Sequence, residues 1–332
     1  MDLSTIFLGL PLKNPLIAGA SPLTASLDCI KTLEDNGIAA IIMHSLFEEE
    51  INHDIHQMDR YLHGYSDANA EGTSYLPDES DFENLQVDHY LKEVQAVKEA
   101  LSIPVIGSLN GVSPGGWVKY AHKLQEAGAD GLELNITYIP TSPDVEGYQV
   151  EQMYIDTVAM VAQQIAIPLN VKMNPYFSNP VNMAKRFVEA GAKGLSIFDN
   201  PTHVDVDIEL LTPLQRANIT TSSNLSETLR WCAILYKQFG CSLCANTGVH
   251  TGEDVLKTMM SGADAAALAS VLLLKGEGEI QKILSDMKEW MEKHEYDSIS
   301  QMKGSISLLN SDNPSAFERN SYRYALQHYR RD

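Results

Sequence analysis

The sequence predicts an α/β protein, a (β/α)8 TIM barrel with a long insertion after its second strand and a helical C-terminal extension. Three observations predict this fold. Short apolar runs alternate with amphipathic segments eight times, glycine or proline separates each helical segment from the following run, and the runs are apolar on both faces. Eight such units close as a barrel, and a doubly wound open sheet is the alternative.

The junctions between helices and strands share one pattern. A glycine that follows a helix and directly precedes an apolar run is typical of a helix C-terminus. This pattern occurs at 36–40, 127–131, 190–194 and 261–265, and a proline stop occurs at 102–105 and 166–169. We therefore expect strands near 16–20, 39–43, 103–108, 131–136, 168–173, 194–198, 241–246 and 264–269. Helices are expected near 26–36, 88–101, 116–127, 150–165, 180–190, 226–239, 251–262 and 278–294.

Two segments exceed a minimal barrel. The stretch 44–87 is much longer than an ordinary loop and predicts a polar lid on a barrel domain of residues 1–300. His53 and His56 lie within it, but their spacing alone does not define a metal site, and we expect none. Residues 301–332 predict a C-terminal extension with an aromatic and basic helical pattern at Tyr322–Arg330, packed on the barrel or on a neighbouring subunit.

Charge and composition exclude several classes of function. The chain has 332 residues, a net charge of −20 and a pI of about 4.8, which disfavours binding to nucleic acid or to anionic membranes. The first residues lack the pattern of a signal peptide, and apolar runs are too short to span a membrane. We expect a cytoplasmic protein with a small-molecule substrate.

The four cysteines do not predict a disulfide framework or a metal site. Cys241 and Cys244 lie three residues apart in an expected strand, so their side chains point to opposite faces and cannot share a metal. Cys29 and Cys232 stand apart from them, and no clustered spacing suits an iron–sulfur centre. Packing in the core is the favoured interpretation.

Polar residues gather where the expected strands end, and in a (β/α)8 barrel that end carries the active site. They are Ala20-Ser21, His44-Ser45, Ser108 to Asn110, Asn135 to Tyr138, Lys172 to Asn174, Asp199-Asn200, Ser222-Ser223, Asn246 to Gly248 and Ser270. Such a set predicts a hydrogen-bonding pocket for a planar ring rich in heteroatoms.

The seventh loop, 246–254, leads directly into a helix. Backbone N–H groups at a helix start bind phosphate, so Gly248 and Ser270 are the candidate phosphate ligands. Thr251 and Asp254 also fit a capping box, and an ordinary capped helix explains the loop equally well.

Lys172 ends an otherwise apolar strand, where a solvated surface lysine is not expected. It suits two kinds of chemistry: stabilising an anionic reduced flavin, or forming a Schiff base if its pKa is depressed. A lysine that reaches solvent at the rim of the barrel is the alternative without chemistry.

Several segments, in order and at the expected strands, resemble the FMN-dependent dihydroorotate dehydrogenase family, class 1. They are Leu8–Leu16 with Ala20–Pro22, Val105–Gly111, Leu132–Asn135, Val171–Phe177 and the 246–254 loop. Met302–Ser305 and Ala316–Arg319 extend the similarity to the subgroup described as dihydroorotate dehydrogenase-like. The resemblance covers about residues 1–300.

The resemblance implies FMN at the mouth of the barrel and a homodimer. Ala20 and Ser21 would lie near the flavin ring, Lys172 near its N1 and O2, and the phosphate at Gly248 and Ser270. Asn110 and Asn135 fall where family asparagines bind flavin or substrate, and Ser222, Asn246 and Thr247 complete the candidate cofactor set. In the family a base removes a proton from one substrate carbon, and hydride passes from the adjacent carbon to flavin N5.

Three positions depart from the family pattern. The loop that carries a Cys or Ser base in the family reads Asn135–Pro140 here, so Tyr138 is the nearest replacement and Thr137 a weaker one. A tyrosine needs a nearby cation to accept a proton at neutral pH. The lysine usual after strand two is His44, which we place near flavin or substrate, and the paired glycines of the phosphate loop are Thr247-Gly248.

Three functions are therefore compared. The first is a flavin-dependent dehydrogenase of the CH–CH class, acting on dihydroorotate or a related small polar ring in pyrimidine biosynthesis. The second is a Schiff-base lyase or aldolase that uses Lys172. The third is a catalytically weak protein that binds FMN or a phosphate ligand, which the altered base and phosphate loops favour.

Overall fold

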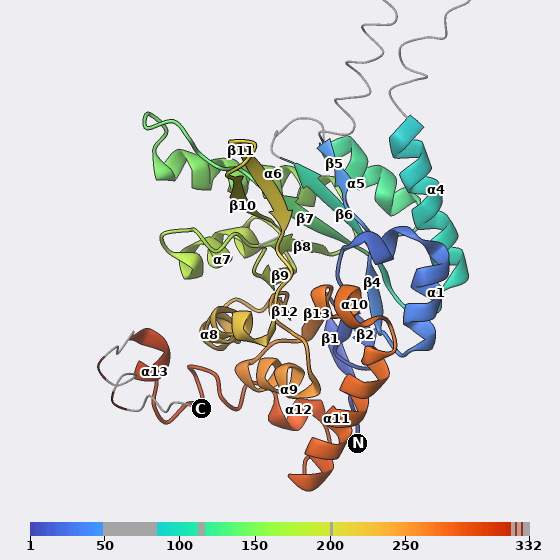
Figure 1. Ribbon diagram of the computed structural model, residues 1–332, viewed down its shortest axis with the longest axis vertical. Coiled ribbons are helices and arrows are strands. Elements are labelled where there is room, and N and C mark those ends of the chain that lie inside the picture. Colours follow the sequence, from blue (N-terminus) through green and yellow to red (C-terminus); the bar gives the residue numbers. More distant parts are fainter. Residues whose placement is uncertain (49–84, 112–116, 200–201, 320–322, 324–326, 328–332) are drawn as a thin grey trace, which may run out of the picture.

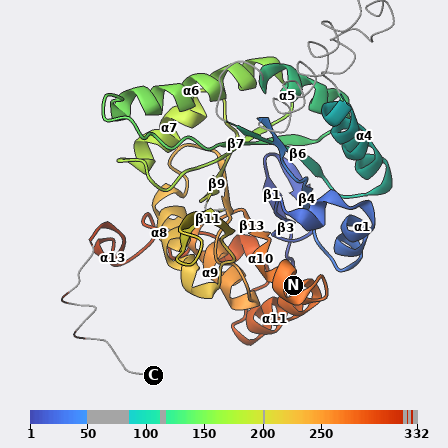
Figure 2. The same ribbon diagram turned by 45° about the horizontal axis from the view of Figure 1, so that its top comes forward.

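The computed structural model describes residues 1–48, 85–111, 117–199, 202–319, 323 and 327 (Figure 1). Eight parallel strands form a closed barrel, and a ring of helices surrounds it (Figure 2). Each strand pairs with its neighbours in chain order, and β13 pairs with β3 to close the ring. The eight are β3 (Leu16–Ala18), β4 (Ala40–Ile42), β6 (Val105–Gly111), β7 (Gly131–Ile136), β8 (Leu169–Lys172), β9 (Gly194–Ile197), β12 (Ser242–Ala245) and β13 (Ala265–Leu268).

Helices follow the strands around the outside of the barrel. They are α1 (Leu27–Asp35), α4 (Leu85–Ala100), α5 (Trp117–Glu126), α6 (Gly147–Gln164), α7 (Pro180–Glu189), α8 (Leu225–Leu235), α9 (Gly252–Ser261), α10 (Ser270–Lys275) and α11 (Glu279–Lys293). The predicted barrel, with its eight strands and eight crossover helices, is thereby confirmed. The short helix α10 between β13 and α11 was not predicted.

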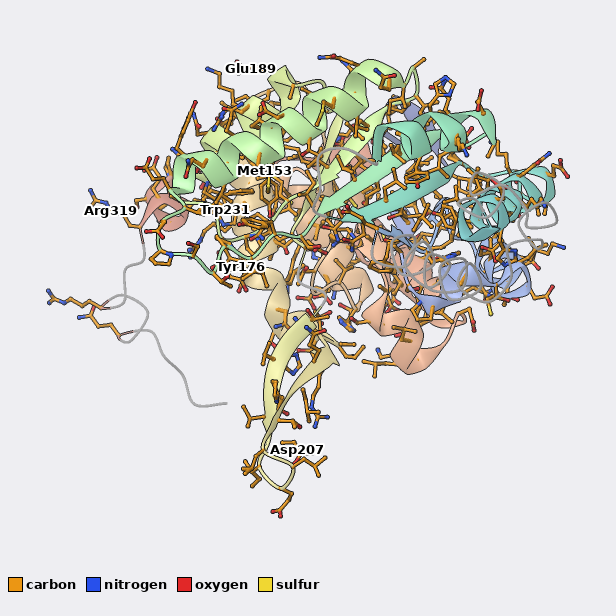
Figure 3. The ribbon with its side chains drawn as sticks, turned by 90° about the horizontal axis from the view of Figure 1, so that it is seen from above. Met153, Tyr176, Glu189, Asp207, Trp231 and Arg319 are labelled. Carbon is orange, nitrogen blue, oxygen red and sulfur yellow. The ribbon has the colours of Figure 1, made fainter. Side chains whose placement is uncertain are left out.

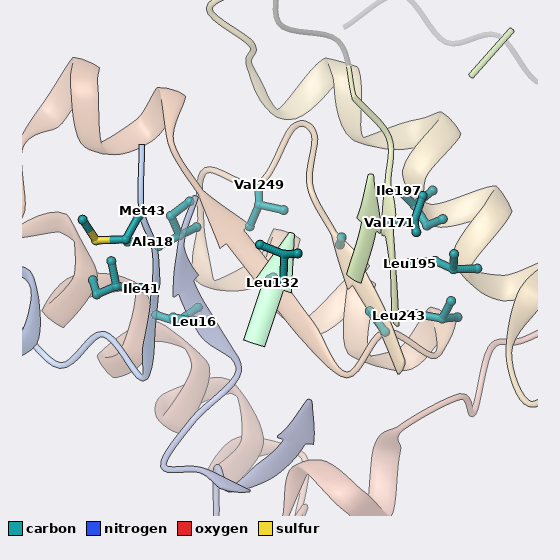
Figure 4. Close-up of a cluster of buried hydrophobic side chains, with 14 of the residues drawn as sticks. Leu16, Ala18, Ile41, Met43, Leu132, Val171, Leu195, Ile197, Leu243 and Val249 are labelled. Carbon is teal, nitrogen blue, oxygen red and sulfur yellow. The ribbon is translucent and has the colours of Figure 1, made fainter. Parts of the chain in front are cut away.

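Most of the core lies between the strands and the surrounding helices. One buried cluster contains outward-facing residues from around the barrel: Leu16 and Ala18 of β3, Ile41 of β4, Met43 just after β4, and Leu132, Val171, Leu195 and Leu243 of β7, β8, β9 and β12 (Figure 4). Strand residues on the other face point into the barrel and form a second, smaller cluster with the N-terminal residues. Both faces are buried because the runs are apolar on both sides.

The N-terminal hairpin closes the bottom of the barrel. Strands β1 (Thr5–Phe7) and β2 (Leu10–Leu12) pair antiparallel, and Phe7, Leu8 and Leu12 pack on the starts of the barrel strands. The hydroxyl of Ser242 accepts the Leu8 N–H at 3.0 Å. The sequence did not predict this hairpin, because three-residue strands carry too little alternation to be recognised.

A second unpredicted hairpin leaves the barrel after β9. Strands β10 (Thr202–Asp207) and β11 (Thr212–Ala217) pair antiparallel and project from the body of the molecule, with Asp207 near the far end (Figure 3). Its side chains are mostly exposed. A further short strand, β5 (Leu46–Phe47), extends the sheet beside β6.

The segment after α11 lies against the barrel. Helix α12 (Ile299–Met302) buries Ile299 and Met302, and the following turn donates backbone hydrogen bonds from Gly304 to Met259 and from Leu308 to Ala233. Helix α13 (Ser315–Glu318) follows. The proposed lid falls mostly outside the described residues, as do His53, His56 and most of Tyr322–Arg330. Among the described helices, none is long and apolar enough to cross a bilayer.

Gly262 provides a test of how tightly the outer layer packs. Its φ is +111°, and a Cβ there would lie 2.5 Å from the Tyr236 ring. We expect Gly262→Ala to lower the free energy of unfolding by about 2–4 kcal/mol, measured in urea. Gly9, with a φ of +78° in the two-residue turn between β1 and β2 and no heavy atom within 4 Å of such a Cβ, is the matched control and should lose about 1 kcal/mol. Equal losses would contradict the packing argument.

Candidate active site

Two cavities lie at the C-terminal ends of the barrel strands. The lysine cavity, about 110 Å³, is lined by residues that include Gly19, Ala20, Lys172, Asp199, Gly248 and Ser270. The tyrosine cavity, about 470 Å³, is lined by residues that include Tyr138, Tyr154, Asn174, Tyr176, Phe177 and Asp199. The two share Asp199 in their walls.

A larger cavity of about 920 Å³ lies at the opposite end, between the N-terminal hairpin and the strand starts at Pro168 and Ser242. Chemistry in this fold takes place at the C-terminal ends of the strands, where the loops that vary between enzymes meet. The lysine and tyrosine cavities are therefore the candidate active site in spite of their smaller size.

Strand register brings the charged groups of the site together. Asn170 of β8 lies beside Glu133 of β7, and Lys172 lies beside Asn135 of β7 and Ser196 of β9. Side chains two residues apart on a strand share a face. Glu133 and Asn135 therefore point to the same side of β7, Asn170 and Lys172 to the same side of β8, and all four point into the barrel. Three adjacent strands thus contribute to one polar group.

Lys172 is the cation of this group. Its Nζ lies 3.1 Å from Oε1 of Glu133 and 3.8 Å from Oδ1 of Asp199. Burial lowers the pKa of the Lys172 ammonium, but the two carboxylates outweigh it and the net pKa is raised. The lysine is therefore held protonated, which opposes the Schiff-base mechanism because that chemistry needs a free amine.

Glu133 is fully buried, and hydrogen bonds supplement its ion pair. Its Oε2 accepts from the Asn170 amide at 2.9 Å and from the Ser196 hydroxyl at 3.2 Å. The Asn170 amide also donates to the Ser196 hydroxyl at 2.8 Å. A buried carboxylate is tolerated only with a cation and with donors of this kind.

Asp199 stands where the two cavities meet. Its side chain is 9% exposed. Burial raises the pKa of its carboxyl, while Lys172 and the Asn135 side chain oppose the rise by favouring the charged form. The sequence marked Asp199 as a polar strand end without giving it a role.

The donors and acceptors at and beside the lysine cavity suit the ring of the flavin that the resemblance implies, with Asn135 next to Lys172 in the strand register. Oδ1 of Asn135 is buried without a hydrogen-bond partner among the described residues, so it can accept from a ring N–H. Lys172 can donate to a ring oxygen. The walls also include Gly19, Ala20, Ala267 and Ala269, whose small side chains leave room for a flat ring. The ring half of FMN therefore fits in its chemistry, although the cavity encloses only part of such a molecule.

The phosphate half relies on backbone groups and hydroxyls. Lys172 is the one lysine or arginine among the described residues that line the lysine cavity. Gly248, with a φ of +84°, admits no side chain because a Cβ would lie 2.4 Å from the Leu225 nitrogen. The hydroxyl of Ser270 accepts the Thr220 N–H at 3.1 Å. Asn246 and Thr247 line the same cavity, and each donates to the Phe198 carbonyl.

The start of helix α9 is occupied by its own cap. The buried carboxylate of Asp254 accepts the N–H groups of His250 and Thr251, both at 3.0 Å, and the Ser222 hydroxyl at 2.6 Å. The interpretation of Ser222 as a strand end is wrong: it begins a short 3-10 helix (Ser222–Asn224), and no described strand lies between Ala217 and it.

His44, Ser21 and Asn110 lie around the rim. His44 Nε2 is 3.6 Å from Glu93, and the Tyr90 hydroxyl donates to the His44 carbonyl at 2.7 Å. Ser21 caps a short 3-10 helix (Pro22–Ala25). Asn110 accepts from the Thr137 hydroxyl at 3.0 Å. Among the described residues, none of these three side chains lines either cavity.

Tyr138 and Thr137 line the tyrosine cavity, away from the wall that holds Lys172. The Tyr154 hydroxyl accepts the Tyr138 N–H at 3.2 Å and so fixes the loop. Burial raises the pKa of Tyr154. No contact between the Tyr138 side chain and Lys172 is found in the described part of the chain, so the cation that Tyr138 would need is not beside it.

Sequence reasoning assigned no role to Glu133, Asn170 or Ser196. The signal was present, because Glu133 and Asn135 are two apart on one strand and a lysine ends the next. An acid inside an apolar run needs a buried cation, and Lys172 was the candidate.

The interpretation of Cys241 and Cys244 as residues that pack in the core is confirmed. Cys244 packs in the cluster inside the barrel, whereas Cys241 and Cys232 pack in the outer cluster. Burial raises the pKa of the Cys241 thiol to about 11 and that of Cys232 to about 12. No group of three or more potential metal ligands occurs among the residues described.

Comparison with known proteins finds relatives that match most of the chain. The family model for dihydroorotate dehydrogenase matches residues 2–291. The dihydroorotate dehydrogenase B (NAD(+)) catalytic subunit of Thermoplasma acidophilum is 27% identical over 312 residues, which cover 91% of this chain and 98% of the relative. That of Methanocaldococcus jannaschii is 24% identical, with 88% and 94% covered. The chloroplastic dihydropyrimidine dehydrogenase (NADP(+)) of Arabidopsis thaliana is 19% identical, with 91% and 76% covered.

Removing Lys172 tests the buried ion pair. We expect Lys172→Met to lower the free energy of unfolding by about 3–5 kcal/mol, because Glu133 is left buried without its cation. Adding Glu133→Gln should recover part of the loss. The control is Lys98→Met, whose partner Asp130 lies 2.6 Å away in a half-exposed pair, and it should lose about 1 kcal/mol or less. Similar losses for both lysines in urea titrations would refute the argument.

His250 predicts part of the pH dependence of stability. Burial lowers its pKa, Asp254 partly opposes this, and Lys275 adds to it. Below a pH of about 6.5, the usual pKa of histidine, the His250 imidazole therefore binds a proton more readily in the unfolded chain than in the folded protein. Stability should fall as the pH drops from about 7 to 5, and His250→Gln should lose less over that range in thermal melts. Parallel curves for the two proteins would show that His250 contributes nothing.

Proposed function

Because the chain belongs to the dihydroorotate dehydrogenase family, we propose that it uses FMN to oxidise a CH–CH bond of dihydroorotate or of a related small polar ring. Family membership makes the protein a flavin-dependent oxidoreductase, and the choice of FMN and of the ring is the proposal. The observation that carries it is the lysine cavity, lined by a buried protonated lysine whose register neighbour on β7, Asn135, has an amide oxygen without a partner among the described residues.

The residues of this cavity would divide the binding of FMN between them. Lys172 would hold positive charge beside the ring, and Asn135 Oδ1 would accept a ring N–H. The backbone around Gly248, with the Ser270 hydroxyl, would hold the phosphate. When bound, FMN would supply the hydride acceptor at N5. A fixed ammonium in a buried site stabilises negative charge that develops on the ring.

The substrate would occupy the tyrosine cavity. Oxidation of the CH–CH bond to C=C releases a hydride from one carbon and a proton from its neighbour. Tyr138 is the proposed proton acceptor and Thr137 a secondary one, since both line this cavity; because no cation lines it among the described residues, Tyr138 would accept a proton only as the tyrosinate. His44 would contact the flavin or the substrate from the rim of the barrel. Its imidazole ring is held there by an edge contact with the Tyr90 ring and by Glu93.

Assembly and place of action follow from the same proposal. The relatives named catalytic subunits belong to enzymes with another subunit, and this chain would form a homodimer in the cytoplasm and bind such a subunit or another electron acceptor. Oxidation of dihydroorotate would place it in pyrimidine biosynthesis.

The first test is the visible absorption spectrum of the protein purified without added cofactor, repeated during titration with FMN. We expect flavin bands that bleach under anaerobic conditions when a dihydropyrimidine is added. Flavin uptake without bleaching by any such ring would favour a weak binding protein. No uptake at saturating FMN would refute the proposed function.

The role of Tyr138 is tested in the same assay. We expect Tyr138→Phe to slow the bleaching about a hundredfold or more while flavin uptake stays the same. Tyr148, which is exposed on α6, is the matched control, and Tyr148→Phe should leave the rate unchanged. An unaffected rate in Tyr138→Phe would transfer the proton-acceptor role to another group.

A further inference from the structure

The walls of the tyrosine cavity show which substrates it can hold. Tyrosine, phenylalanine, isoleucine, proline and valine side chains form most of the lining, with the Asn174 amide and the hydroxyls of Thr137 and Thr202. Among the described lining residues Asp199 alone carries a charge, and no lysine, arginine or histidine is present. Those lining residues would therefore offer a bound carboxylate no cation to pair with.

Lys172 does not supply the missing cation. It lies in the wall of the lysine cavity, 3.1 Å from Glu133 and 3.8 Å from Asp199. The group thus contains one cation and two carboxyls before any ligand enters. Lys172 is absent from the lining of the tyrosine cavity, whereas the carboxylate of Asp199 is present there and carries the same sign of charge as a bound carboxylate, and like charges placed together are strongly disfavoured.

Asp199 also offers a positive recognition element. Its carboxylate is at the junction of the cavities, 9% exposed, and can accept an N–H from a ring bound on the tyrosine side. A hydrogen bond from a neutral donor to a charged acceptor is stronger than one between neutral groups. A ring with N–H groups and no anionic substituent satisfies this wall, whereas a ring carboxylate does not.

We infer that the tyrosine cavity selects a neutral ring with N–H donors over an anionic ring, and that Asp199 is the residue that determines this selectivity. The inference rests on the proposed function and narrows it. Within the dihydropyrimidines, the preferred substrate class is the ring that lacks the carboxylate of dihydroorotate.

Uracil and orotate test this directly, because they share one ring and differ in a carboxylate. Their affinities for the flavin-loaded protein are measured by calorimetry and by the shift of the flavin spectrum. We expect uracil to bind at least about tenfold more tightly than orotate. Likewise, dihydrouracil should bleach the flavin faster than dihydroorotate at equal concentration.

Two variants test whether charge in the tyrosine cavity causes the preference for uracil over orotate. Asp199→Asn should raise the affinity for orotate relative to uracil at least about tenfold, since it removes the repelling carboxylate. Tyr176, 83% exposed in the cavity wall, allows a cation to be added without disturbing the core, and Tyr176→Arg should also favour orotate. The matched control is Asp205→Asn on the exposed hairpin, which should leave the ratio unchanged.

Each outcome decides between distinct ideas. Orotate binding as tightly as uracil, or an unchanged ratio in both Asp199→Asn and Tyr176→Arg, overturns the inference and leaves the proposed function intact. Failure to take up FMN overturns the proposed function instead. In that case the same calorimetry on the protein without flavin still tests the inference, and binding of neither ring overturns it.

Discussion

The buried carboxylate of Glu133 constrains the interior of the barrel. It has no solvent exposure, so its charge requires a cation and hydrogen-bond donors within the protein. Lys172 supplies the cation, and Asn170 and Ser196 supply the donors. A shift of β8 by one residue would turn Asn170 and Lys172 away from the barrel interior. The partners of this one acid thus favour the observed register of β7, β8 and β9, in which the lysine stands at the mouth of the barrel.

The site built on this group has two unequal halves. On the ring side, a protonated lysine, an unpaired amide oxygen and small wall residues are fixed by strands, which are rigid supports for a ligand. On the phosphate side, Asp254 already binds the N–H groups of His250 and Thr251, the two residues that lead into α9. A carboxylate at that position stabilises the helix, but it occupies N–H groups that a phosphate would otherwise use. The positive charge that could bind a flavin nucleotide is therefore on the ring side, at Lys172, and the phosphate side offers N–H groups and hydroxyls.

The sequence predicted the barrel well because each repeated unit carries its own signals. At 127–131 and 190–194 a glycine ends a helix and an apolar strand follows, and the structure places α5 before β7 and α7 before β9 there. Both antiparallel hairpins were missed. β1 and β2 are too short to show a period, and the exposed β10 and β11 lack a buried face.

The site was predicted only in part, for a physical reason. The strand-end rule led to Lys172, Asn135 and Gly248, which indeed lie at the mouth of the barrel. It could not reveal which side chains share a wall, because that depends on register and rotamer. Ser222 looked like a strand end by its polarity, yet its hydroxyl serves the cap of α9. The position of Asp199 between the two cavities could not be predicted from the sequence, because the cavities are formed by loops from several strands.

The hairpin at the bottom of the barrel has a consequence for the chemistry at the top. Phe7, Leu8 and Leu12 pack inside the starts of the strands, so this end of the barrel is lined with apolar groups. The local permittivity around Glu133 and Lys172 is lowered by such packing, and electrostatic interactions strengthen as permittivity falls. The hairpin Thr5–Leu12, which contributes no charged side chain, thereby helps to set the strength of the electric field at the mouth of the barrel.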